Sequence, residues 1–288
     1  MLTAGALVAF AANSVLCRLA LGRAAIDAAS FSTIRLASGA CVLLLITAAV
    51  NRNAPALGRG NPASAVLLFL YAAAFSFAYN GLGAGAGALI LFGSVQATMI
   101  LSALRSGERP HVLEWSGLGL ALCGLVYLVF PGLAAAPPLV SSASMTVAGI
   151  AWGLYSLRGR GAAGPLVETT RNFVLALPLA FIVNLLMFRD AHVTRKGVIL
   201  AMLSGALASG VGYVVWYAAL RGLTATRAAT VQLAVPVLAA LGGVLFLSER
   251  ISLRLLLAAF VILGGVGLAL SGRAQTAQSK TASSVRRN

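Results

Sequence analysis

Residues 2–21, LTAGALVAFAANSVLCRLAL, form an apolar run in which Arg18 is the only charged side chain. A helix that crosses a membrane needs about 20 mostly apolar residues, so this run predicts a first membrane span. It has neither the charged leading segment nor the small-residue cleavage site of a removable signal peptide. We therefore expect it to stay in the protein as its first transmembrane helix.

Runs of the same kind recur along the whole chain, separated by short linkers. The first half contains windows at residues 2–21, 30–50, 63–80, 85–105 and 111–130. The second half contains windows at residues 140–158, 166–188, 197–220, 226–247 and 253–271. The sequence thus predicts an all-α membrane protein with ten transmembrane helices and leaves no segment for a soluble domain.

Composition supports this fold class. Apolar and aromatic residues make up 60% of the chain and charged residues only 9%, whereas a soluble domain carries about 25% charged residues. The net charge is +15. A basic excess on so apolar a chain indicates loops that contact anionic membrane lipid rather than a surface that binds nucleic acid.

The distribution of basic residues predicts the orientation. If the N-terminus is cytoplasmic, Lys and Arg in the inner loops and the tail outnumber those in the outer loops, as the positive-inside rule requires. Both termini are then cytoplasmic. Residues 273–288 are polar and basic without apolar periodicity, which predicts a disordered cytoplasmic tail.

The two halves of the chain resemble each other when they are overlaid. Residues 1–136 and 137–272 each hold five windows, and an odd number of spans forces the second copy to enter the membrane from the opposite side. Such inverted repeats are typical of transporters that work by alternating access; the alternative is chance similarity between Leu/Ala/Gly-rich helices. The overlay pairs Arg18 with Arg158, Thr33 and Arg35 with Thr169 and Arg171, Gly81-Leu82 with Gly222-Leu223, and Glu108-Arg109 with Glu249-Arg250.

Several of these residues resemble a known family, the EamA type of the drug/metabolite transporter superfamily. The resemblance covers residues 2–272 and rests on Asn13 to Arg18, on Arg35 and Arg171, on the stretch Ala151 to Tyr155, and on Pro236 thirteen residues before Glu249. It implies ten helices in two inverted repeats, a bacterial inner-membrane location and export as the direction of transport. Two positions depart from the family pattern: Ala12 stands where many members have tryptophan, and Val95 stands where the first repeat would carry proline.

The sequence gives no support for an enzyme. The two histidines, His111 and His192, lie at span edges or in loops, and no HExxH, GxGD or GxSG motif is present. Cys17, Cys41 and Cys123 lie in apolar runs without metal-ligand spacing. We therefore expect no catalytic residues, no metal and no cofactor.

Substrate contacts are expected where polar and aromatic side chains lie near the middle of the spans. Their hydroxyl, amide and aromatic groups suit small zwitterions such as amino acids. Alternatively, the Ser and Thr side chains bond their own helix backbone and the aromatic rings only pack. Ser94 and Gln96 point to different faces of one helix, so only one of them can face a cavity. The candidates are Asn13, Tyr79, Ser94, Gln96, Thr98, Trp152, Tyr155, Ser209, Tyr213, Trp216 and Gln232.

Acidic residues are absent from the middle of the predicted spans. Proton-coupled exporters usually place a buried Asp or Glu where protons and substrate compete. We therefore expect a secondary transporter that exports amino acids and related small metabolites without obligatory proton coupling. The alternatives are an exporter of a sugar derivative or a drug and, less favoured, a channel.

Arginines near span ends are candidates for gates. Arg18 and Arg35 would lie at the outer side with Asp27 and Glu249, and Arg158 and Arg171 at the inner side with Glu108 and Glu168. The alternative is that these arginines only anchor helix depth. Pro178 and Pro236 lie within spans and are candidate hinges. Ten helices suffice to enclose a path, so we expect a monomer.

Overall fold

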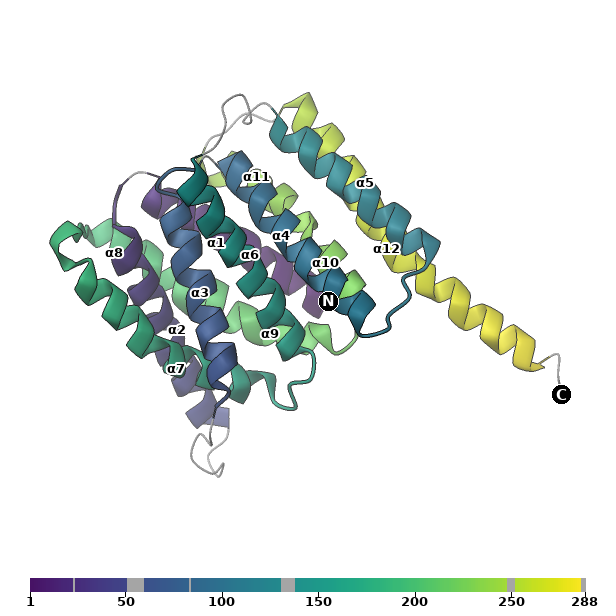
Figure 1. The fold of residues 1–288 in the computed structure, drawn as a ribbon, viewed down its shortest axis with the longest axis horizontal. Coiled ribbons are helices and arrows are strands. Elements are labelled where there is room, and N and C mark those ends of the chain that lie inside the picture. Colours follow the sequence, from purple (N-terminus) through teal and green to yellow (C-terminus); the bar gives the residue numbers. More distant parts are fainter. Residues whose placement is uncertain (23, 51–59, 83, 131–137, 248–251, 286–288) are drawn as a thin grey trace.

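The fold is a bundle of helices in a computed structural model (Figure 1). It describes residues 1–288 except 23, 51–59, 83, 131–137, 248–251 and 286–288; the side chains of residues 84–85, 247 and 272–285 also lie outside the description. Within the described residues every regular element is helical, apart from one isolated antiparallel bridge between Ile26 and Val193. The all-α prediction is confirmed.

The helices follow the predicted windows closely. The first half contains α1 (Leu2–Leu21), α2 (Ala28–Val50), α3 (Pro62–Ala78), α4 (Ala84–Arg105) and α5 (Val112–Val129). The second half contains α6 (Leu139–Gly159), α7 (Pro165–Leu186), η2 (Phe188–Asp190), α8 (Arg195–Leu203), η3 (Ser204–Val211), α9 (Gly212–Leu220), α10 (Ala225–Gln232), α11 (Ala234–Leu247) and α12 (Leu253–Val285).

Eight helical stretches of the described chain are long and apolar enough to cross a membrane. Two of the ten predicted windows are not among them: α3 has only 17 residues, and α6 carries three serines and a threonine in its first half and Arg158 near its end. The protein is therefore a multi-pass membrane protein with eight such helices in its described part.

Two predicted windows are interrupted in the structure. The window 197–220 contains a π-helical segment, η3, between α8 and α9. The window 226–247 breaks between Gln232, where α10 ends, and Ala234, where α11 begins. Pro236 has no N–H to donate to the carbonyl of Gln232, and its ring crowds that carbonyl, which explains the break. By contrast, α7 continues through Pro178.

Helices from the two halves interleave. α6 packs against α3 and α4, α7 packs against α2 and α3, and α1 packs against α9 and α11. α5 and α12 lie side by side at one edge of the bundle (Figure 1). A Cβ on Gly117 would lie 2.4 Å from the carbonyl oxygen of Gly265, and a Cβ on Gly265 would lie 2.6 Å from that of Gly117. Glycine at both positions allows these two backbones to touch.

The C-terminal tail differs from its prediction. α12 continues as a helix to Val285 and extends away from the bundle (Figure 1), whereas the sequence predicted disorder from residue 273. The tail contains Ala, Gln, Lys and Arg, which favour helix, and it continues a helix that is already nucleated.

Candidate substrate site

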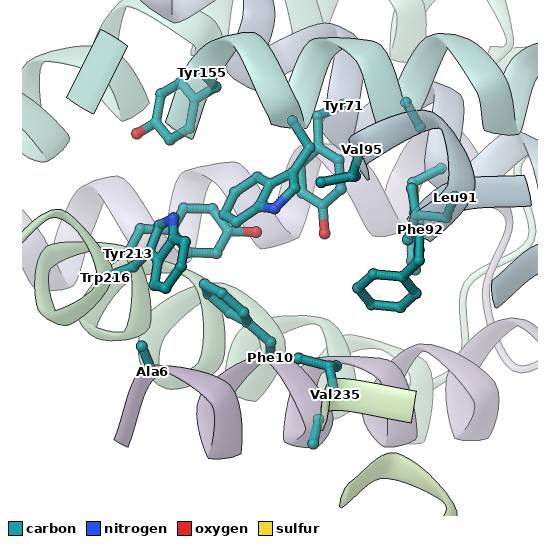
Figure 2. Packing of buried hydrophobic residues seen from close by; sticks show 14 of the residues in the cluster. Ala6, Phe10, Tyr71, Leu91, Phe92, Val95, Tyr155, Tyr213, Trp216 and Val235 are labelled. Carbon is teal, nitrogen blue, oxygen red and sulfur yellow. The ribbon is translucent and has the colours of Figure 1, made fainter. Parts of the chain in front are cut away.

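A layer of aromatic side chains fills the middle of the bundle. We call Phe10, Tyr71, Trp152, Tyr155, Tyr213 and Trp216 the aromatic cluster; they come from α1, α3, α6 and α9. Figure 2 shows Phe10, Tyr71, Tyr213 and Trp216 gathered between these helices. Trp152 lies at its centre. Its ring centroid is 4.8 Å from that of Tyr71, 4.8 Å from that of Tyr213 and 5.2 Å from that of Phe10.

Small residues set the position of Trp152 in the cluster. A Cβ on Gly149 would lie 2.6 Å from the carbonyl oxygen of Leu91, and a Cβ on Gly153 would lie 3.0 Å from Thr98. These two glycines let α6 cross closely over α4. Trp152, between them in sequence, then donates through Nε1 to Oε1 of Gln232 at 2.6 Å.

Arg35 lies beside the cluster and is only 1% exposed. Its Nε donates to Ser209 Oγ at 2.8 Å, and its Nη2 donates to the Tyr213 hydroxyl at 2.6 Å. The guanidinium carbon lies 5.3 Å from the centroid of the Tyr71 ring, a cation–π distance. Nη1 is buried and has no hydrogen-bond partner. Within the described chain no carboxylate lies within 4.0 Å of this guanidinium.

The π-helical segment η3 brings the partners of Arg35 into place. A Cβ on Gly205 would lie 2.0 Å from the Arg35 carbonyl oxygen, so the backbones of η3 and α2 touch there. Ser209 lies within η3, and Tyr213 follows in the first turn of α9. π-helical turns are frequent at functional sites. This one carries Ser209 and leads directly into the turn of α9 that carries Tyr213.

The structure brings together about half of the predicted substrate residues. Trp152, Tyr155, Ser209, Tyr213 and Trp216 all lie in the cluster or against Arg35, and Gln232 accepts from Trp152. The others lie elsewhere. Asn13 accepts from Ser204, Tyr79 packs edge-to-face against Phe75, Gln96 donates to the carbonyl of Ala229, and Ser94 and Thr98 face the α6 glycines. Of the latter, Thr98 also donates to the carbonyl of Ser94, its own helix backbone.

Three aromatic or polar residues near the site were not predicted: Phe10, Tyr71 and Asn172. Phe10 contacts both tryptophans of the cluster, and Asn172 reaches the Tyr155 hydroxyl at 3.5 Å. A signal for Tyr71 exists in the sequence, because Tyr71, Phe75 and Tyr79 recur every four residues and so share one face of α3.

Both ends of the bundle carry polar contacts, and we name the ends after an acidic residue. The Asp27 end contains the α1–α2 and α7–α8 loops, and these two loops are joined. Thr194 donates to the Ala25 carbonyl through its N–H at 3.0 Å and through Oγ1 at 2.7 Å, and Asp27 N–H donates to the His192 carbonyl at 2.8 Å. We call these contacts, with the Ile26–Val193 bridge, the latch.

The Asp27 side chain supports the latch. Its carboxylate accepts from the N–H groups of Ser30 at 2.8 Å and His192 at 3.0 Å. Burial opposes ionisation of this carboxyl, but the two N–H donors outweigh it and hold the pKa of Asp27 below its ordinary value. The sequence predicts Asp27 in a polar cluster with Arg18 and Arg35. In the described part of the structure the Asp27 carboxylate instead binds loop N–H groups and forms no ion pair with Arg35.

At the Glu108 end, where α6 meets α3 and α7, the protein has a hollow of about 340 Å³. We call it the vestibule; its lining is Asn61, Ser64, Arg158, Gly161, Ala162, Glu168, Asn172 and Tyr217. Tyr217 donates through its hydroxyl to the Tyr155 carbonyl at 3.2 Å. Tyr155, together with Tyr217 and Asn172, therefore separates the vestibule from the other members of the aromatic cluster.

The predicted gate arginines have varied surroundings. Arg158 shares the vestibule with Glu168 and donates to Ser64 Oγ at 3.0 Å. Arg171 has a buried Nε without a partner, and Arg18 lies in the last turn of α1. Glu108 pairs with Arg160 at 3.2 Å, which was not predicted. Glu249 and Arg250 lie outside the described residues.

Comparisons with known proteins agree with this architecture. The chain is 48% identical over 273 residues to an uncharacterized protein of Pseudomonas aeruginosa, and the match covers 95% of this chain and 94% of that protein. A solved crystal structure has the same fold, with a TM-score of 0.75 at 19% identity over 95% of this chain and 99% of that one. Residues 142–271 match the EamA-like transporter family. The chain therefore belongs to the EamA-like transporter family, and is a multi-pass membrane transporter of small molecules.

Proposed function

We propose that this protein is a secondary transporter that exports amino acids and related small metabolites across the bacterial inner membrane. Transport proceeds by alternating access between two inverted five-helix repeats, without obligatory proton coupling. Both termini are cytoplasmic, so the vestibule opens inward and the latch closes the outer side.

One observation carries this proposal: the latch and the vestibule use corresponding positions of the two repeats. The register that pairs Thr33 with Thr169 also pairs Ala25 with Gly161 and Ile26 with Ala162. The latch uses the first member of each pair, and the vestibule is lined by the second.

The partner loops correspond in the same way. Thr194 and Asn61 are the N-cap residues of α8 and α3, and each accepts through its side chain from the first turn of its helix. Counting onward, Gly197 corresponds to Ser64. Thr194 and Gly197 touch the Ala25 carbonyl, whereas Asn61 and Ser64 line the vestibule. One end is closed where its counterpart is open, which is the asymmetry that alternating access between inverted repeats requires.

Helix packing supports the same symmetry. The contacts of α6 with α3 and α4 correspond to those of α1 with α9 and α11. The pairs α2–α7, α4–α10 and α5–α12 each join corresponding helices. Such packing permits the contacts made by one repeat to exchange for the corresponding contacts of the other repeat with little change in free energy.

The lining of the site supports the substrate class. Aromatic faces and neutral hydrogen-bonding groups suit a small molecule with an apolar side chain, and aromatic faces also attract an ammonium group. The ion pairs Glu108–Arg160 and Glu114–Arg227 lie near helix ends, which favours transport without a proton-carrying carboxylate in the aromatic cluster. A sugar derivative or a drug is the alternative substrate.

Counterflow into proteoliposomes tests this function. Labelled neutral amino acids should accumulate against preloaded unlabelled substrate, with and without an imposed pH gradient, and empty liposomes provide the control. Accumulation that disappears without the pH gradient would contradict uncoupled transport. If none of the amino acids accumulates, amino-acid export is contradicted and another metabolite class becomes the proposed substrate.

Trp152→Ala tests the site itself. The substitution removes the ring that contacts Phe10, Tyr71 and Tyr213, and we expect counterflow to fall while Trp152→Phe retains part of it. Size-exclusion chromatography of both variants controls for folding. Unchanged counterflow in Trp152→Ala would make the residue a packing element only.

A further inference from the structure

Arg35 carries a charge that the described protein does not neutralise. A guanidinium stays protonated in proteins, and a buried charge without a partner is strongly unfavourable. Arg35 lies on α2, away from the lipid-facing surface, with 1% exposure. It therefore cannot reach a membrane surface in this conformation, and a depth anchor does not explain its position.

The hydrogen bonds of Arg35 leave one part of the guanidinium free. Nε and Nη2 donate to Ser209 and Tyr213, but buried Nη1 has no hydrogen-bond acceptor in the described part of the chain. Both acceptors are hydroxyls, so each also has an O–H hydrogen of its own to donate. The group lacks an acceptor, and a negatively charged one would satisfy the hydrogen bond and the charge together.

We propose that Arg35 is the anchor for a small organic carboxylate. The carboxylate lies against Nη1 of Arg35, and the apolar part of the molecule lies among the rings of Tyr71, Trp152 and Tyr213. This inference rests on the proposed transport function and narrows its substrate class. The substrate must carry a carboxylate to bind, but it need not carry an ammonium group.

The route to Arg35 runs from the vestibule. Asn172 and Tyr217 line the vestibule and contact Tyr155. The Tyr155 ring centroid lies 6.2 Å from that of Tyr213, whose hydroxyl accepts from Arg35. A carboxylate that enters the vestibule meets Arg158 first and reaches Arg35 when the Tyr155–Tyr217 layer opens.

Intrinsic tryptophan fluorescence of the purified full-length protein can report binding. The chain has three tryptophans, of which Trp152 and Trp216 lie in the cluster and Trp115 is exposed. A Trp115→Phe background therefore places both remaining fluorophores at the site. Four probes share an isobutyl chain and do not absorb at the excitation wavelength: L-leucine, 4-methylpentanoate, L-leucinamide and 3-methylbutylamine.

We expect L-leucine and 4-methylpentanoate to bind with dissociation constants at least tenfold lower than those of the amide and the amine. Arg35→Gln should remove this preference, and Arg35→Lys, which keeps the charge, should retain part of it. Arg254→Gln removes an exposed charge far from the cluster and serves as the matched control. A monodisperse elution profile establishes that each variant is folded.

Several results would overturn the proposal. These are equal affinity for all four probes, a carboxylate preference that survives in folded Arg35→Gln, or no response of the wild-type protein to either acid. Displacement of the acids by chloride at equal concentration would assign the site to inorganic anions instead. Carboxylate binding without counterflow would leave the anchor intact and contradict transport, so the two proposals fail separately.

Discussion

At the Asp27 end two loops meet through main-chain groups, whereas at the Glu108 end the corresponding segments stand apart around a hollow. The latch joins Ala25 and Asp27 to Thr194 and His192 by backbone hydrogen bonds. The Glu108 end is held by side chains instead: Glu108 accepts from Ala225 N–H at 2.9 Å and pairs with Arg160.

The closed end is thus held by backbone hydrogen bonds, and the open end is held by side-chain contacts. Backbone hydrogen bonds need a close approach of two loops, which a glycine at position 197 permits. Side-chain contacts such as Arg158 with Ser64 span a wider gap. The sequence of the latch is therefore suited to tight closure. The vestibule is lined by the corresponding residues of the other repeat, which are held apart.

Locking the latch should have the largest effect. Ile26 and Val193 form an antiparallel bridge, and opposed residues in such pairs lie about 4.5–5.5 Å apart between Cα atoms, within disulfide range. In a cysteine-free background, oxidised Ile26→Cys/Val193→Cys should lower counterflow more than about tenfold, because the outer side cannot open. Reductant should restore it.

The single variant Ile26→Cys, treated with the same oxidant, controls for damage. Full counterflow in the cross-linked protein would show that the Asp27 end does not open during transport.

Forcing the latch apart with a larger side chain should have the second-largest effect. A Cβ at position 197 would lie 2.4 Å from the Ala25 carbonyl oxygen, so Gly197→Leu should destabilise the closed end by about 1–3 kcal/mol. Maleimide labelling of Ile26→Cys, where the wild-type side chain is 2% exposed, should accelerate about tenfold or more.

Ser64→Leu at the corresponding position of the other repeat is the matched control and should not expose Ile26→Cys. Equal labelling in both variants would remove the distinction between the two ends.

Removing the Thr194 side chain should have a smaller effect. Thr194→Val loses the cap on Gly197 N–H and one bond to Ala25, a loss of about 1–2 kcal/mol. Labelling of Ile26→Cys should rise several-fold. Asn61→Ala removes the equivalent cap of α3 and should lower thermal stability to a similar degree without exposing Ile26→Cys. If both variants raise labelling alike, the effect is general loosening.

The smallest effect concerns pH. The pKa of Asp27 is lower in the folded protein than its ordinary value of 3.8. Its contribution to stability is therefore complete well above pH 3.8 and is lost as pH falls through the lowered folded pKa. Wild-type thermal stability should decline more steeply below about pH 4 than that of Asp27→Asn. Parallel curves would mean that the carboxylate does not support the latch.

Local sequence predicted the helices well because apolar length decides where a membrane helix forms. The π-helical segment η3 was not predicted, because it depends on close contact between Gly205 and α2. A kink at Pro236 was predicted, but not that α10 would end at Gln232 and α11 begin at Ala234. The predicted windows ran straight through both.

The site was predicted in part. Aromatic residues near span centres, such as Trp152 and Tyr213, indicated the cluster because large rings seldom lie there without partners. The tertiary partners could not be read from one helix at a time. Gln96 bonds Ala229 on α10, and Arg35 bonds hydroxyls from η3 and α9 rather than the carboxylate of Asp27.

The most direct test of the account asks whether closing one end depends on opening the other. Asn61→Cys/Gly161→Cys places thiols at the vestibule positions that correspond to Thr194 and Ala25, in a cysteine-free protein within proteoliposomes. If the two ends alternate, Gly197→Leu, which opens the latch, accelerates cross-linking of this pair about tenfold. An identical cross-linking rate with and without Gly197→Leu would contradict alternating access between the two ends.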